Sequence, residues 1–316
     1  MTQLLNAIPG ALAQGLIWGV MAIGVYITYK VLDIADLTVD GSLCTGAAVV
    51  VMRSIATGGA VAAVLIIGGC NVWVAMIAAF LVGMLAGLAT GLFHTFMGIP
   101  AILAGILTQM VLWSVNLKIL GKANQALPAR SIDVLLTQMN IPAALPVLLG
   151  WAAVLVTLLV LFFSTELGCA LRATGCNPVM SRAQGVNTGL MKVIGLALSN
   201  AVVAMSGGLL CQYQGYTDVN MGRGAVVIGL AAVVIGQAVL GRHGGHMAAQ
   251  LGGVVLGAVI YYIVYQVIIF AGFDTDLLKM FSAVVVAVFL GVPHVRDQIR
   301  TNSRIKKGGS RHAENV

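Results

Sequence analysis

Long apolar stretches follow one another along the chain, separated by shorter polar ones. Most reach the length of about 20 residues that a membrane-spanning α-helix needs. The region 41–69 is interrupted by Arg53 and rich in glycine, so a short or broken helix fits it better than one continuous span. The pattern predicts an all-α polytopic integral membrane protein with about nine (roughly 8–10) transmembrane segments. Besides that region, the predicted segments are 9–29, 72–93, 101–120, 147–164, 193–211, 225–240, 248–270 and 277–292.

The composition supports this class. Hydrophobic residues make up 59% of the chain and charged residues 9%, whereas soluble domains carry about 25% charged residues. Continuous apolar runs exclude a transmembrane β-barrel, whose strands alternate apolar and polar positions. Glycine spacings such as Gly83-xxx-Gly87-xxx-Gly91 and Gly253-xxx-Gly257 suit close helix packing, although helices that merely tolerate glycine would show them too.

The composition of the polar stretch 165–192 is not that of a flexible linker. It predicts two short helices joined at an angle, with caps and stops at their ends. The predicted helices are 166–173, ended by Gly175, and 179–184, started by Asn177 and Pro178 and ended by Gly185.

Apolar and basic side chains are mixed along this polar stretch. Leu171, Val179 and Met180 lie among Arg172 and Arg182. A surface of that kind can dock into a groove of a partner protein. A plain loop between two membrane spans is the alternative interpretation.

The end of the chain is strongly basic. A basic tail beside a membrane span marks the cytoplasmic side and can contact anionic lipid, so the net charge of +7 does not indicate nucleic-acid binding. We divide the chain into a transmembrane domain, 1–293, and a basic cytoplasmic tail, 294–316. Counting spans back from the tail places 165–192 in the cytoplasm and the N-terminus outside. The basic residues of the tail are Arg296, Arg300, Arg304, Lys306, Lys307 and Arg311.

Two similar polar turns lie in opposite halves of the chain. Each carries an acidic residue, contains glycine and leads into an unusually short apolar segment: 36–41 before 46–51, and 218–222 before 224–228. By the span count they lie on opposite faces of the membrane. Inverted repeats whose broken helices line a transport path have this pattern, and chance is the alternative.

Polar side chains near membrane spans are costly and often functional. Asp36, Thr38, Asp40 and Ser42 are therefore candidates for a translocation pathway or its gate. Alternatively, they lie in a hydrated loop and cap the following helix. A second group comprises Gln212, Gln214, Asp218 and Asn220 at the outer end of a span, with Asn200 inside that span, where helix packing is the alternative role.

No catalytic residue set is found in the sequence. There is no GxxxxGK[ST] phosphate-binding loop, so the chain should not hydrolyse ATP itself, and neither HExxH nor GxSxG occurs. His243 and His246 lack a neighbouring carboxylate or thiol and are interpreted as part of a polar turn, so no metal is expected. The five cysteines form no CxxC pair and are interpreted as packing residues.

The segment LGCALRATGCNPVMSRAQGVNTGLMK, followed by SNAVVAMSGGLL, resembles the cytoplasmic coupling segment of permease subunits of bacterial ABC importers. The similar branch includes branched-chain amino acid and ribose permeases, and GLAAVVIGQAVLGRHGG resembles its second glycine-rich signature. DLTVDGS and QYQGYTDVNMGRG resemble a subgroup in which some members are tied to aromatic amino acid uptake. The resemblance covers about residues 10–293; it departs at 53–69, which looks like an insertion, and at Cys176, where an acid is common.

The resemblance implies how such a chain would work. Two copies would form a homodimeric pore in the bacterial inner membrane, two cytoplasmic ATPase subunits would bind ATP and Mg, and an extracytoplasmic binding protein would deliver the solute. The chain itself would be no enzyme and would hold no cofactor. The ATPase-coupling residues it implies are Leu167, Gly168, Leu171, Arg172, Ala173, Thr174, Gly175, Asn177, Met180 and Gly185.

The solute itself is not encoded in these motifs. Uptake of an amino acid, with an aromatic one preferred, is the first hypothesis, and import of a sugar or nucleoside by the same machinery is the next. An ion-coupled secondary transporter that uses Asp36, Asp40 and Asp218 is the alternative from another class. The paired-helix coupling segment favours the importer over such a carrier, and the polar clusters disfavour a membrane scaffold without transport.

Overall fold

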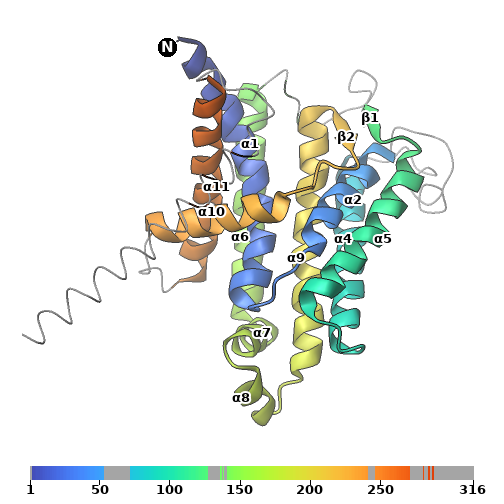
Figure 1. Ribbon diagram of the computed structural model, residues 1–316. Helices are drawn as coiled ribbons and strands as arrows, with labels where there is room; N and C mark the ends of the chain where they lie inside the picture. Colours follow the sequence, from blue (N-terminus) through green and yellow to red (C-terminus); the bar gives the residue numbers. More distant parts are fainter. Residues whose placement is uncertain are drawn as a thin grey trace, which may run out of the picture.

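The computed structural model shows an all-α bundle with one very small sheet (Figure 1). The residues that it describes are 2–52, 72–126, 136, 138, 141–240, 246–270, 280, 284 and 287. The helices are α1 Thr2–Tyr26, η1 Ile27–Val31, α2 Thr38–Met52, α4 Val72–Thr95, α5 Ala101–Leu120, α6 Ile141–Ser164, α7 Glu166–Cys176, α8 Pro178–Ala183, α9 Thr188–Gln214, α10 Ala225–Leu240 and α11 Met247–Phe270.

Six of the helices in the described part of the chain are long and apolar enough to cross a membrane. The candidate spans begin at Ala7 within α1 and at Val72, Ala101, Ile141, Thr188 and Met247, where the other five helices start. Two shorter apolar helices, α2 and α10, accompany them. The predicted segment 277–292 falls almost entirely outside the described residues, as do 53–69 and the tail 294–316.

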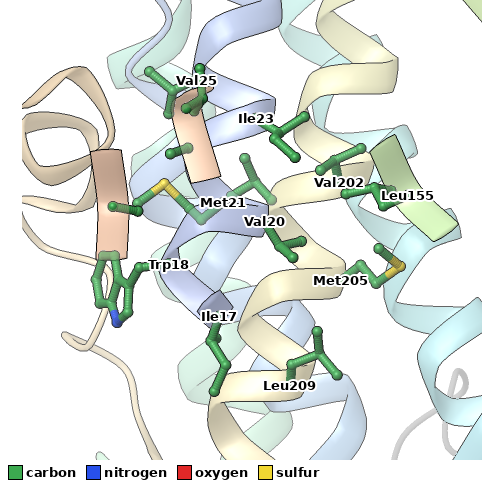
Figure 2. Close-up of a cluster of buried hydrophobic side chains, with 14 of the residues drawn as sticks. Ile17, Trp18, Val20, Met21, Ile23, Val25, Leu155, Val202, Met205 and Leu209 are labelled. Carbon is green, nitrogen blue, oxygen red and sulfur yellow. The ribbon is translucent and has the colours of Figure 1, made fainter. Parts of the chain in front are cut away.

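The bundle is built around α1 and α9. The most apolar window of α1 is 83% buried and that of α9 is 89% buried, whereas the other long helices are 22–39% buried. Figure 2 shows Ile17, Val20 and Ile23 of α1 in one apolar cluster with Val202 and Leu209 of α9. The other helices therefore shield a two-helix centre and leave an apolar outer surface, as membrane helices do.

Small residues allow the helices to approach one another closely. A methyl group at Gly83, Gly87 or Gly91 of α4 would meet the backbone of α9, so the predicted glycine stripe packs against that helix. In the same way, a side chain at Gly257 of α11 would overlap the Ala232 carbonyl oxygen of α10. Such contacts favour glycine at helix crossings in membranes.

A short non-helical connection separates the first membrane helix from the second. α1 continues into the π-helix η1, and residues 32–37 then connect it to α2, which starts at Thr38 rather than near Gly41. Asp33 adopts φ +55°, a left-handed conformation that Asp tolerates better than most residues. The expected short helix in 41–69 is thus confirmed as far as Met52.

A second short helix has an unusual direction. In Figure 1, α10 lies across the bundle instead of along it. The chain reaches it from the end of α9 through β2, Tyr216–Asp218, which pairs antiparallel with β1, Asn124–Ala126. Asn124 lies opposite Asp218, so this small sheet ties the ends of α5 and α9 together; the sequence pattern predicted only loops at both positions.

Candidate functional site

Helices α7 and α8 form the predicted paired-helix segment at one end of the bundle (Figure 1). The Thr165 hydroxyl oxygen accepts a hydrogen bond from the Gly168 amide at 3.3 Å and caps α7. The Asn177 carboxamide oxygen accepts hydrogen bonds from the amides of Val179 (3.1 Å) and Met180 (3.0 Å). These caps satisfy amides that a helix start leaves unpaired, so the predicted N-cap of the second helix is confirmed.

The predicted stop of the first helix is wrong. Helix α7 runs through Gly175 and ends at Cys176. A methyl group at Gly175 would overlap the carbonyl oxygen of Val31 in η1, so this glycine permits a close approach between two segments instead of ending a helix. Gly185 follows α8 with φ +83°, a conformation that glycine adopts readily.

The proposed coupling residues divide into an exposed and an inward-facing set. Leu171 is only 1% exposed, so its place on a docking surface is corrected: its apolar side chain packs into the core of its own chain. The inward-facing set is Gly168, Leu171 and Thr174, with Gly175 partly buried. The exposed set is Leu167, Arg172, Ala173, Asn177, Met180 and Gly185.

A cavity of about 470 Å³ is lined by α8 and the start of α9. Its lining combines the exposed apolar side chain of Val179 with Arg182 and Lys192, and it also includes Pro178 and Ala183. The Arg182 guanidinium donates a hydrogen bond to the Thr188 hydroxyl at 3.1 Å, which holds the cation against the following helix. This end of the molecule therefore presents a basic rim around apolar surface.

Four of the proposed pathway residues lie together inside the bundle. The Asn200 carboxamide donates a hydrogen bond to Asp36 at 2.7 Å and accepts one from Ser42 at 2.6 Å. The second Asp36 oxygen accepts the Thr38 amide at 2.9 Å. Asp36 is buried and does not lie in an exposed loop, yet it does bond to the first amide of α2 as the capping interpretation expected.

Two threonines that the sequence pattern did not single out extend this cluster. The Thr38 hydroxyl lies 2.8 Å from that of Thr90 in α4, which in turn donates to Thr108 in α5 at 2.9 Å. Each threonine occupies a single position in an apolar helix, so nothing in its local sequence indicates a shared cluster.

Asp40 joins the starts of the two short helices. It lies in the first turn of α2, and its carboxylate oxygens accept hydrogen bonds from the amides of Gly224 (3.1 Å) and Val226 (3.0 Å) at the start of α10. A helix N-terminus carries partial positive charge, so the carboxylate is well placed there. The Gly222 amide donates to the Cys44 sulfur at 3.1 Å and adds a second link between the two segments.

The remaining pathway candidates lie at the far end of α9. Gln212 is buried and its side-chain amide donates to the Met76 sulfur at 3.2 Å. Gln214 is half-buried at the end of α9, and Asp218 accepts the backbone amide of exposed Asn220 at 2.6 Å. Asp36, Thr38, Ser42 and Asn200 therefore form one hydrogen-bonded group, Asp40 links the starts of α2 and α10, and the other candidates lie toward the far end of α9.

Comparison with known proteins places these features in a family. Residues 8–293 match the family described as branched-chain amino acid transport system, permease component. A tyrosine transport system permease protein of Clostridioides difficile (strain R20291) is 34% identical over 95% of this chain and 96% of its own length. An uncharacterised protein of Rickettsia prowazekii (strain Madrid E) is 29% identical over 90% and 97%, respectively.

A more distant relative matches part of the chain. The autoinducer 2 import system permease protein LsrC of Escherichia coli (strain K12 / DH10B) is 30% identical over 194 residues, which are 58% of this chain and 54% of that protein. The family match spans all the predicted membrane segments. This chain belongs to the family of permease components of branched-chain amino acid transport systems, and it is the permease subunit of an ABC importer.

Proposed function

We propose that two copies of this chain form the pathway of an amino acid importer in the bacterial inner membrane. Two cytoplasmic ATPase subunits, which bind ATP and Mg, would power it, and an extracytoplasmic binding protein would deliver the solute. The observation that carries this proposal is the exposed α7–α8 surface at one end of the bundle. A chain without a phosphate-binding loop does not bind ATP in this way itself, so it needs a contact surface through which a separate ATPase can transmit its conformational change.

The docking surface combines apolar and basic side chains. Val179 is 78% exposed and Met180 63% exposed, and Arg182 and Lys192 line the cavity beside them. Exposed apolar side chains inside a charged rim are typical of protein interaction sites. A groove with apolar walls and acidic edges on the ATPase is the complementary partner surface.

Movement of the docked helices α7 and α8 would be transmitted directly to η1, at the end of the first membrane helix. Gly175 of α7 packs against the Val31 carbonyl of η1, and Leu32 packs against Gly195 of α9. Leu32 begins the connection 32–37, and this connection contains Asp36, which accepts a hydrogen bond from Asn200. Rigid displacement of α7 therefore shifts the start of α2, in the manner of packed helices that slide as units.

The arrangement of the short helices supports an inverted repeat. The connection 32–37 approaches the centre from the α7 end, and the connection after β2 approaches from the opposite end (Figure 1). The starts of α2 and α10 then meet at Asp40. Short helices that start inside a bundle are typical of transport pathways. With the predicted segment 277–292, the six long and two short helices give nine segments.

The proposed orientation places α7 and α8 in the cytoplasm. Arg172, Arg182 and Lys192 lie at that end, and basic loops favour the cytoplasmic side. The N-terminus of α1 lies at the opposite end of the bundle, which is then outside (Figure 1). The basic C-terminal tail is also proposed to be cytoplasmic, and the span count back from it gives the same side for 165–192.

An amino acid, with an aromatic one preferred, is the proposed solute. The support is the tyrosine transport permease, which is 34% identical over nearly the whole of both chains. Import of a sugar or nucleoside is the second candidate, because the partial relative LsrC is named for autoinducer 2.

Reconstitution tests the proposal. Proteoliposomes that contain the permease and its ATPase are supplied with ATP on the ATPase side and with the binding protein and labelled L-tyrosine on the other. We expect ATP-dependent accumulation that ADP does not support, and unlabelled sugars and nucleosides test the second candidate by competition. The permease alone should show no flux under a proton or sodium gradient. Gradient-driven flux would contradict the ABC mechanism and favour the ion-coupled carrier.

A further inference from the structure

A cavity of about 500 Å³ lies between α2, α5 and the segment that precedes α10. Its volume falls within the range of roughly 300–1,000 Å³ that is usual for sites of small molecules. Such sites combine apolar walls with a few converging polar groups. The lining residues that matter below are Asp40, Gln109, Met110, Trp113, Asn116 and Arg223.

Opposite charges border this cavity without pairing. Asp40 of α2 and Arg223 of the segment before α10 both line it. Within the described part of the chain, the Arg223 guanidinium has no ion-pair or hydrogen-bond partner. The Asp40 oxygens accept two backbone amides but, as carboxylate oxygens, retain further acceptor sites. A solute that carries both charges can bridge the two side chains.

Asn116 provides an independent indication of a polar ligand. The residue lies in the cavity wall and is fully buried, and neither its amide nitrogen nor its amide oxygen has a hydrogen-bond partner among the described residues. Buried polar atoms are nearly always satisfied, because leaving one unpaired is costly. A carboxamide can donate and accept at once, which matches a ligand that offers both kinds of group.

The apolar wall of the cavity comes from α5. Trp113 is 44% exposed and Met110 is 65% exposed, so both side chains present accessible surface beside the polar groups. An indole ring packs well against another aromatic ring, and a methionine adapts to varied apolar shapes. The cavity thus joins a charged end and an aromatic wall.

We propose that this cavity binds an aromatic α-amino acid as it passes through the permease. Arg223 holds the α-carboxylate, Asp40 attracts the α-ammonium group, and Asn116 hydrogen bonds to the same polar end. Trp113 packs against the solute side chain. The proposal rests on the amino acid import proposed above and adds the residues that contact the solute.

Direct binding to the full-length chain tests this assignment. The purified chain in lipid nanodiscs is titrated with labelled L-tyrosine, and tyramine, which lacks the carboxylate, serves as competitor. We expect saturable binding of L-tyrosine and competition by tyramine that is at least about tenfold weaker, because a site built to bind a group rejects an analogue without it. Arg223→Gln should remove this discrimination. Lys118→Gln, which neutralises an exposed cation elsewhere on α5, should leave it unchanged.

Asn116→Leu separates binding from folding. It replaces an unpaired buried amide by an apolar group of similar size, so the melting temperature should stay the same or rise. L-tyrosine affinity should nevertheless fall about tenfold. Absence of saturable binding, or equal affinities in Asn116→Leu, Arg223→Gln and the unaltered chain, would overturn this inference even if the complete importer takes up L-tyrosine. Failure of that uptake for every amino acid would overturn the proposed function as well.

Discussion

Asp36 is a carboxylate inside an apolar bundle, and its neighbours explain how it is tolerated. It accepts hydrogen bonds from Asn200 and from the Thr38 amide, and Asn200 also accepts one from Ser42. Burial of a polar group is costly unless its bonding capacity is satisfied. These bonds attach the break between η1 and α2 to the central helix α9.

Substitution of Asn200 tests this attachment. Asn200→Leu removes one partner from Asp36 and one from Ser42, and it should lower the free energy of unfolding by about 1–3 kcal/mol. Thermal unfolding of the detergent-solubilised protein, followed by tryptophan fluorescence, should show a melting temperature several degrees lower. The exposed side chain of Asn220 offers a control, and Asn220→Leu should melt with the unaltered protein. Equal melting of Asn200→Leu would mean that the network contributes little.

The sequence indicated that Asp36, Ser42 and Asn200 were candidate functional residues, but it did not indicate that they form hydrogen bonds with one another. Asp36 and Asn200 are 164 positions apart, and hydrophobic periodicity reports the face of a helix, not its partner. The same limit explains why Thr90, Thr108 and Asn116 escaped notice. Each is a single polar position in an apolar helix, and only the folded chain brings it to a cluster or a cavity.

At the scale of elements, local signals were informative where the local chain decides the structure. Asn177 and Pro178 start α8 as predicted, because capping depends on neighbouring residues alone. For Gly175 the same local reasoning wrongly predicted a helix end. The glycine is required instead by the close approach of η1, which is distant in sequence. The glycine stripe of α4 predicted close packing, whereas its partner α9 became evident only from the structure.

The α4–α9 contact can be tested with a matched pair of glycines. A methyl group at Gly87 would overlap the Leu196 carbonyl oxygen, whereas at Gly150 of α6 it would meet open space. Gly87→Ala should therefore destabilise the protein by about 1–3 kcal/mol through overpacking. Gly150→Ala should be neutral or slightly stabilising, because alanine is the better helix former. Similar melting temperatures for both variants would show that α9 yields at this contact.

Docking and transmission on α7 and α8 should be separable. Val179→Glu places a charge in the exposed apolar surface and should abolish copurification of the ATPase. Gly175→Ala disturbs the contact with Val31 on the opposite side of the segment, so the ATPase should still bind while L-tyrosine uptake falls at least about tenfold. Pull-down and uptake assays on the same membranes measure the two effects. Normal uptake by Gly175→Ala would remove η1 from the coupling route.

For the whole molecule, the central feature is the meeting of α2 and α10. Both short apolar segments and the polar turns before them could be recognised in the sequence, and so could the similarity between the two turns. Their contact through Asp40 was not, because it joins segments 184 and 186 positions apart. Connections from opposite ends of the bundle thus reach one point, where a single carboxylate holds two helix starts together.

Asp40→Ala tests whether this carboxylate joins the two halves of the permease. The substitution removes the acceptor of the Gly224 and Val226 amides and should cost about 1–2 kcal/mol, as loss of a helix cap does. Since the start of α10 would then be free to move relative to α2, ATP-driven uptake should fall by more than the loss of folded protein explains. Because Asp40 also lines the proposed solute cavity, the fall in uptake should in addition exceed the loss of L-tyrosine affinity that Asp40→Ala shows in nanodiscs. Asp33→Asn serves as control, because Asp33 is exposed in the same connection and asparagine also adopts its left-handed conformation. If Asp40→Ala transports at the rate of the control after correction for protein amount, the two halves move without this link, and the contact is only a helix cap.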